Sequence, residues 1–144
     1  MEAVTQSYRY ALKAIALTVL IALALHATTA RASDDQLRVA RDMIRTLEAY
    51  AVYKMGQYDL AFERYLALAE DGNRQGMLNV ANMYSEGKGV AQSDSKAFSW
   101  YLRAAEVGDR IAMEHVANAF RTGKGVQENA ERARYWEMRA RAGD

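Results

Sequence analysis

The sequence contains no cysteine and no proline. Without cysteine the chain cannot form disulfides, thiolate nucleophiles, cysteine-based zinc sites or a lipoprotein anchor. Without proline its helices can run uninterrupted, because proline breaks helix interiors. Histidine is scarce as well, since His115 is the only histidine after residue 32. A histidine–cysteine dyad or a multi-histidine metal site cannot be built within one chain, so we expect no metal, no cofactor and no catalytic residue.

Neither sign of charge dominates the chain, which has 19 basic and 18 acidic residues. Without residues 1–32 it keeps 16 basic and 17 acidic residues, a net charge of −1. A near-neutral domain lacks the broad basic surface that binding to a phosphate backbone requires, so nucleic acid is not an expected partner. The hydrophobic content of 51% favours a packed core over disorder.

Residues 1–32 have the order of a secretory signal peptide. Arg9 and Lys13 form a short basic start, a small and apolar run covers residues 14–25, and Ala30-Arg31-Ala32 is a small-x-small cleavage pattern. The alternative is a retained transmembrane anchor, but the run is shorter than the about 20 residues that span a bilayer core. We expect cleavage after Ala32, a periplasmic or secreted protein, and no membrane span afterwards.

The rest of the chain repeats itself at one offset, 36 residues. Two segments return at that spacing with nearly the same letters: Val80-Ala81-Asn82 as Val116-Ala117-Asn118, and Gly87-Lys88-Gly89-Val90 as Gly123-Lys124-Gly125-Val126. The same offset relates an earlier set of residues, Ala61, Tyr65, Leu66, Ala69, Glu70 and Gly72, to residues 97–108. We therefore expect one repeat domain, residues 33–144, with units at 34–72, 73–108 and 109–144.

Each unit reads as two helices. Glycines after the helices suit the left-handed conformation, and Asn73, Ser93, Asp109 and Asn129 are candidate N-caps. One buried stripe is expected on each helix of the middle unit: Gly76, Val80, Ala81 and Tyr84, then Ala97, Trp100, Tyr101, Ala104 and Ala105. A single hairpin cannot bury such faces, so neighbouring hairpins must stack. Trp136 would face the open end of the stack and contribute less than Trp100.

These residues resemble the Sel1-like repeat family, relatives of the tetratricopeptide repeats. The family pattern matches Gly76-x3-Val80-Ala81-x2-Tyr84-x2-Gly87-x-Gly89-Val90 and then Ser93-x3-Ala97-x2-Trp100-Tyr101-x2-Ala104-Ala105-x2-Gly108. The match covers residues 73–144, and 34–72 resembles a degenerate first unit with a shorter turn at Gly56. The resemblance implies an all-α fold, a right-handed superhelical stack of three antiparallel helix hairpins (an α-solenoid) preceded by the signal peptide.

The last unit departs from the family pattern. Glu137 and Arg141 stand where Tyr101 and Ala105 stand one unit earlier. A terminal repeat has no successor, so a polar outer face is expected, and these two residues are spaced to pair across one helical turn. The alternative is random drift in a tolerant last helix.

No motif indicates catalysis. The Gly-Lys-Gly segments lack the spacing of a phosphate-binding loop and are expected to be turns. For binding, the resemblance implies that the first helix of each unit lines a concave groove, which places four residues there: Asn79, Asn82, His115 and Asn118. An asparagine amide offers a donor and an acceptor and can hold a peptide backbone. The alternative is a solvated polar row, with His115 as an ordinary surface or packing residue.

The resemblance favours a non-enzymatic protein-interaction scaffold or regulator of the bacterial envelope that binds a protein or peptide through the groove. The alternative is a secreted factor that acts on a host or neighbouring cell. A cell-wall or β-lactam enzyme is less favoured, because the cysteine-rich framework of such relatives is absent here.

Overall fold

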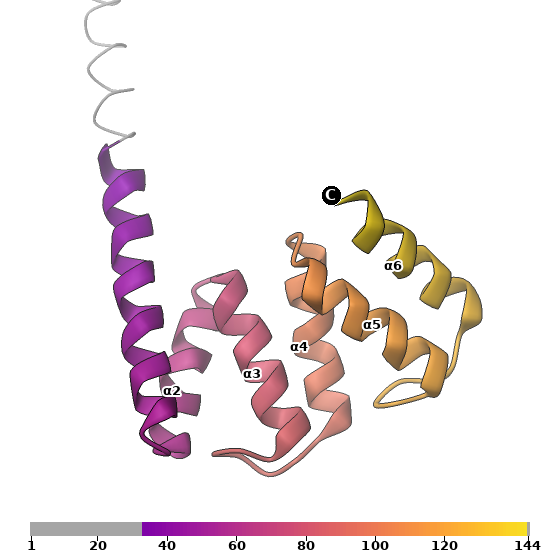
Figure 1. Ribbon diagram of the computed structural model, residues 1–144, viewed down its shortest axis with the longest axis horizontal. Helices are drawn as coiled ribbons and strands as arrows, with labels where there is room; N and C mark the ends of the chain where they lie inside the picture. The colour runs from indigo at the N-terminus through magenta and orange to yellow at the C-terminus, as the bar shows by residue number, and fades with distance from the viewer. Residues whose placement is uncertain (1–32, 144) are drawn as a thin grey trace, which may run out of the picture. The chain divides into compact units, whose positions relative to one another are not determined.

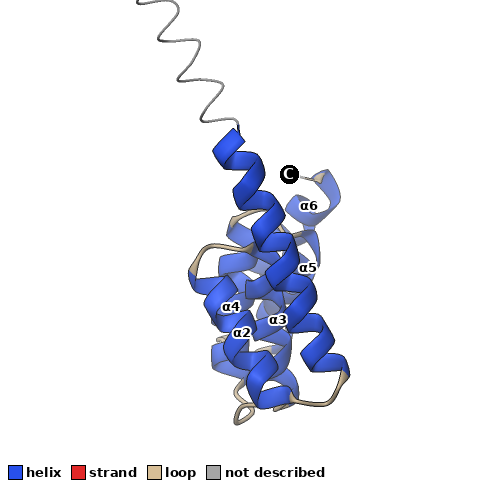
Figure 2. Cartoon of the chain, turned by 90° about the vertical axis from the view of Figure 1, so that its left-hand side faces the viewer, coloured by secondary structure: helices blue, strands red, loops and turns tan. Residues whose placement is uncertain are grey.

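A computed structural model describes residues 33–143; residues 1–32, where the signal peptide is predicted, and residue 144 lie outside the described part. The described residues divide into two units, 33–41 and 42–143. In the first unit, residues 33–41 are helical. The second unit begins with helical residues 42–54 and continues through five further helices (Figure 1). Every regular element between residues 33 and 143 is a helix, as Figure 2 shows.

The five helices of the second unit repeat the sequence offset. Each has 13 residues: α2 Tyr58–Glu70, α3 Arg74–Glu86, α4 Asp94–Glu106, α5 Arg110–Thr122 and α6 Ala130–Ala142. Helices α2, α4 and α6 begin 36 residues apart, and so do α3 and α5. Closely packed helices follow one another along the chain, from α2 with α3 to α5 with α6. Residues 42–143 therefore form the expected stack of three hairpins: 42–54 with α2, α3 with α4, and α5 with α6 (Figure 1).

Side-chain caps fix the starts of four helices. Each predicted N-cap accepts a hydrogen bond from the backbone N–H three residues later, at 2.8–3.3 Å: Asn73, Ser93, Asp109 and Asn129. One such cap stabilises a helix by about 1 kcal/mol. The four predicted caps are confirmed, and they set the helix boundaries without long-range information.

The Gly-Lys-Gly turns pack one hairpin on the previous one. Gly89 and Gly125 have positive φ angles of 67° and 75°. A Cβ at Gly89 would collide with the carbonyl oxygen of Tyr58, and one at Gly125 with that of Asp94. Each turn thus lies against the first residues of the preceding unit's second helix, where only glycine fits. The segment is a structural turn, as the sequence predicted.

The core combines alanines and other small side chains of the predicted stripes with buried aromatic rings such as Tyr101 and Phe120. The expectation for the two tryptophans was wrong. Trp100 is half-buried, and the Arg103 guanidinium covers its ring at 4.1 Å. Trp136 is 7% exposed although it belongs to the last hairpin. Because the helix packed closely on α6 is α5, the Trp136 ring is covered by its own hairpin and needs no following unit.

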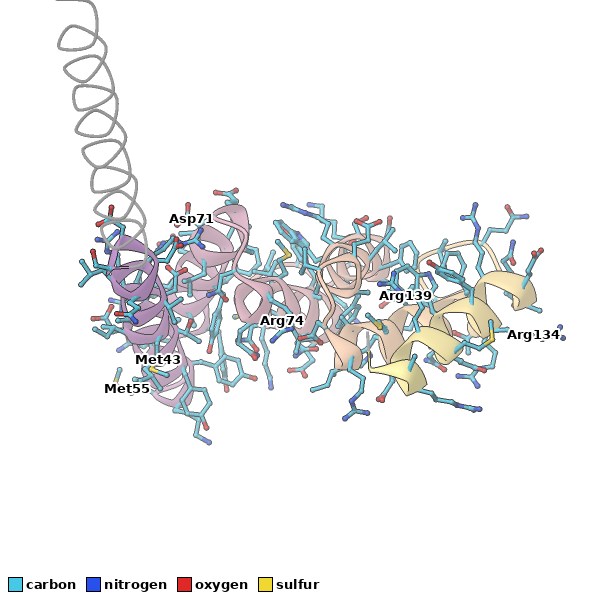
Figure 3. The ribbon with its side chains drawn as sticks, turned by 90° about the horizontal axis from the view of Figure 1, so that it is seen from above. Met43, Met55, Asp71, Arg74, Arg134 and Arg139 are labelled. Carbon is cyan, nitrogen blue, oxygen red and sulfur yellow. The ribbon has the colours of Figure 1, made fainter. Side chains whose placement is uncertain are left out.

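Apolar side chains are exposed at both ends of the second unit. They include Met43 (64%) and Met55 (63%) at one end, and Met138 (64%) at the other end, where Arg134 also projects (Figure 3). In α6 the Glu137 carboxylate lies 3.2 Å from Arg121 Nη1 of α5. Glu137 therefore pairs with the neighbouring helix and not with Arg141 one turn away.

Candidate partner-binding site

Two hollows lie between the first helices of successive hairpins. The first hollow has a volume of about 150 Å³ and is lined by Tyr50, Tyr53, Tyr65, Asn79, Asn82, Met83 and Glu86. The second hollow has a volume of about 250 Å³ and is lined by Ser85, Asp94, Ala97, Phe98, Tyr101, His115, Asn118, Ala119 and Lys124. The first hollow is walled by residues 50–53 and by α3, with Tyr65 contributed by α2. The second hollow is walled mainly by α4 and α5, with Ser85 contributed by α3.

The repeat relates these two hollows to each other. The offset of 36 converts Tyr65 of the first hollow into Tyr101 of the second, and Asn79 and Asn82 into His115 and Asn118. The structure thus divides the four sequence-predicted residues between the hollows, two in each. The tyrosines escaped the prediction because their repeat spacing was attributed to core packing alone.

Asn82 is held by a neighbouring helix. The Tyr101 hydroxyl donates a hydrogen bond of 2.6 Å to Asn82 Oδ1, which ties α4 to α3. The amide NH₂ of Asn82 can still donate a hydrogen bond to a ligand. Asn118 lacks this tie, because Glu137 replaces the tyrosine one unit later; its Oδ1 accepts only a long contact of 3.4 Å from Arg121. The two asparagines share a repeat position but not an environment.

His115 has one face covered and one face exposed. Its ring stacks on Tyr101, with centroids 4.3 Å apart and planes 13° from parallel. Burial lowers the pKa of His115 most; Glu114 and Asp109 act in the opposite direction, and Lys124 lowers the pKa further. The neutral imidazole, with one donor and one acceptor, is therefore favoured near neutral pH.

The Tyr101 hydroxyl stays protonated to a higher pH than that of an ordinary tyrosine. Burial raises the pKa of Tyr101 to about 12, and the negative charge of Glu86 contributes in the same direction. Burial likewise raises the pKa of Tyr65 to about 12, with smaller contributions from Tyr53 and Tyr50. Both hollows consequently contain a neutral phenol at physiological pH, and that of Tyr101 already donates its hydrogen to Asn82.

The second hollow contains both signs of charge. Lys124 Nζ lies 3.5 Å from Asp94 Oδ1, and that oxygen is buried with no hydrogen-bond donor among residues 33–143. No cluster of three or more potential metal ligands occurs in the described part of the chain. Within the same residues, none of the helices has the length and apolar character to cross a bilayer.

A family comparison fits this architecture. The model of the Sel1 repeat matches residues 74–109 and 110–136, which are the middle hairpin and most of the last. Residues 74–136 of the chain therefore contain two Sel1 repeats. The first hairpin lies outside the matched residues, and the turn that joins its helices has three residues, 55–57, against seven, 87–93, in the next hairpin.

Solved Sel1-repeat structures share the fold. A Sel1 repeat protein from Oxalobacter formigenes is 32% identical over 60% of this chain and 66% of its own, with a TM-score of 0.58. The protective antigen c5321 of uropathogenic Escherichia coli is 26% identical over 70% of this chain and 22% of its own, with a TM-score of 0.65. Cysteine-rich protein B of Helicobacter pylori, at 23% identity, covers 58% and 62% with a TM-score of 0.56. The chain spans less than two thirds of each of these proteins. A search of curated proteins gave no match.

Proposed function

We propose that this Sel1-repeat protein is an exported scaffold that holds an extended segment of a partner protein across its two hollows. Sel1-repeat proteins are in general protein-interaction scaffolds. The observation that carries the proposal is the recurrence of four lining positions at the offset of 36: Tyr65, Asn79, Asn82 and Met83 in the first hollow become Tyr101, His115, Asn118 and Ala119 in the second. A repeated site suits a repeated ligand, and the peptide backbone is the simplest such ligand.

The size of the hollows supports a peptide over a compact ligand. Volumes of about 150 and 250 Å³ are below the about 300–1,000 Å³ of pockets that enclose a drug-sized molecule. Each hollow can accept one side chain of a peptide. Asn79 and Asn118 are the amides best placed to bond its backbone, because neither is hydrogen-bonded to another helix.

A selected peptide would test this binding mode. A random peptide library is panned on residues 33–144, and the dissociation constant of a selected peptide is then measured. Replacing Asn79 and Asn118 together by Ala removes one amide from each hollow. Since a net hydrogen bond contributes about 0.5–1.5 kcal/mol, affinity should fall about five- to a hundred-fold.

The matched control is Gln127→Ala, an exposed amide in the turn after α5 that lines neither hollow. It should leave affinity and melting temperature unchanged. Unchanged affinity in the double variant, or a library that yields no binder, would contradict the proposal.

The location is a separate part of the proposal and rests on residues 1–32. Their basic start, apolar run and Ala30-Arg31-Ala32 support export with cleavage before Ser33. Mass analysis of the exported protein should find Ser33 at its amino terminus, and an intact chain in the membrane fraction would contradict cleavage.

A second candidate is a secreted factor that acts on another cell; in its favour, the similar protein c5321 is described as a protective antigen. Recovery from the culture medium instead of the periplasm would support that candidate.

A further inference from the structure

The first hollow has an acidic residue but no basic residue in its lining. Glu86 is its only charged side chain, and the other lining groups are phenols, amides and the thioether of Met83. The second hollow contains Lys124 opposite Asp94, at 3.5 Å. The repeat has therefore produced two hollows of similar construction whose linings differ in charge.

Three tyrosines surround the first hollow at graded depths. Tyr65 is buried, Tyr53 is half-buried, and Tyr50 is 53% exposed. Their phenol groups lie close enough for Tyr53 and Tyr50 to raise the pKa of Tyr65. The face of an aromatic ring attracts cations electrostatically, so this arrangement adds to the attraction exerted by Glu86.

A cation already occupies the rim of this hollow. Lys88 donates a hydrogen bond of 2.9 Å to the Tyr53 hydroxyl, and its Nζ lies 2.8 Å from Glu86 Oε2. The same ammonium lies 5.4 Å from the ring centre of Tyr53 and 5.6 Å from that of Tyr58. Two residues of the hollow, Tyr53 and Glu86, are therefore shown to bind an ammonium group. The Lys88 side chain is 40% exposed, so solvent can receive it when it is displaced.

We propose that the first hollow is a receptor for one basic side chain, arginine or lysine, of the bound peptide. Glu86 provides the opposite charge, and Tyr50, Tyr53 and Tyr65 provide the aromatic wall. Lys88 is an internal competitor that leaves Glu86 when the peptide binds. The inference rests on the proposed function, because the peptide delivers the side chain, and it adds a specificity that hydrogen bonds to a peptide backbone do not provide.

The probes are N-acetyl-arginine amide and N-acetyl-citrulline amide, which have nearly the same shape but differ in charge. Each is titrated into isotope-labelled residues 33–144, and chemical shifts are followed by nuclear magnetic resonance. The arginine derivative should cause saturable shifts at Tyr50, Tyr53 and the Asn79 side chain, and the citrulline derivative should bind at least about five-fold more weakly. Glu86→Gln should abolish this preference.

Two further variants complete the test. Lys88→Met should strengthen binding of the arginine derivative about two- to five-fold, because an exposed ion pair no longer competes. Asp94→Asn, the matched change in the second hollow, should leave the affinity for the arginine derivative unchanged. Equal binding of both probes, insensitivity to Glu86→Gln, or shifts centred on the second hollow would overturn the receptor. Unchanged or weaker binding in Lys88→Met would overturn the competitor role.

The inference and the proposed function can fail separately. If the selected peptide still depends on Asn79 and Asn118 while the arginine derivative does not bind, only the basic-side-chain receptor is wrong. If the arginine derivative binds as expected but the selected peptide is insensitive to both asparagines, the peptide scaffold is wrong and the first hollow is an isolated cation site.

Discussion

Replacing Asn82 by Ala should destabilise the domain, whereas the same change at the equivalent Asn118 should not. Asn82 Oδ1 accepts a 2.6 Å hydrogen bond from Tyr101, a residue only 7% exposed. Its removal leaves a buried hydroxyl without that partner, which costs about 1–3 kcal/mol. The higher helix propensity of alanine offsets about 0.5 kcal/mol of this loss. We expect a net loss of about 1–2 kcal/mol at position 82.

Asn118 is exposed, and within residues 33–143 its only side-chain hydrogen bond is the 3.4 Å contact from Arg121. Its replacement by Ala should change the free energy of unfolding by less than about 0.5 kcal/mol. Thermal unfolding measures both variants, since 1 kcal/mol corresponds to a shift of about 4–8 °C in a domain of roughly this size.

A double-mutant cycle with Tyr101→Phe isolates the hydrogen bond. Once the hydroxyl is gone, Asn82→Ala should cost little more, which gives a coupling of about 1 kcal/mol between positions 82 and 101. Equal destabilisation by the two asparagine replacements, or strict additivity in the cycle, would refute the assignment of Asn82 to a tie between α3 and α4.

Three further outcomes follow from the packing and the pKa values. Gly125→Ala should destabilise the domain by about 2–4 kcal/mol, because the new side chain combines a positive φ with a backbone collision, whereas Gly108→Ala, at positive φ with open space around it, should cost only about 1 kcal/mol. Chemical denaturation compares the two variants, and similar losses of stability would contradict the turn packing. The pKa of Tyr101 is about 12 in the folded chain against about 10 when unfolded, so its contribution to stability is complete below pH 10 and disappears as the pH rises toward 12. Tyr101→Phe should therefore flatten the pH dependence of the melting temperature between pH 10 and 12, and an unchanged slope would contradict the burial of Tyr101. Trp136→Ala should cost about 3–5 kcal/mol and more than Trp100→Ala, and the reverse order in denaturant unfolding would contradict the burial of the two rings.

Much of the fold could be predicted from the sequence because its determinants are local or strictly periodic. A cap such as Asn73 and a turn glycine such as Gly89 act on residues within a few positions, and the offset of 36 carries the same assignment to Asp109 and Gly125. Antiparallel hairpins follow, because short connections leave no other arrangement.

The features that escaped prediction depend on how one helix faces another. The hydrogen bond between Tyr101 and Asn82 joins residues 19 apart, and its existence depends on the rotation of α4 against α3. The pairing of Glu137 with Arg121 is a similar case, since spacing alone favoured Arg141. The burial of Trp136 was misjudged because the repeat pattern does not tell whether a ring packs within its own hairpin or against the next.

The structure places the four predicted site residues in the two hollows, among neighbours that the sequence did not indicate. Asn79, Asn82, His115 and Asn118 do line the hollows, yet whether they bind a partner stays a prediction. The aromatic wall around Tyr50 was missed because it comes from the degenerate first unit, where the offset of 36 is lost in the shorter turn.

A crystal structure of residues 33–144 with a peptide selected from the library would show directly how the partner is held. We expect an extended peptide that crosses both hollows, with side-chain amides of Asn79 and Asn118 within about 3.2 Å of its backbone and one side chain in each hollow. A peptide bound instead as a helix on the exposed apolar face of residues 42–55, with both hollows empty, would contradict it.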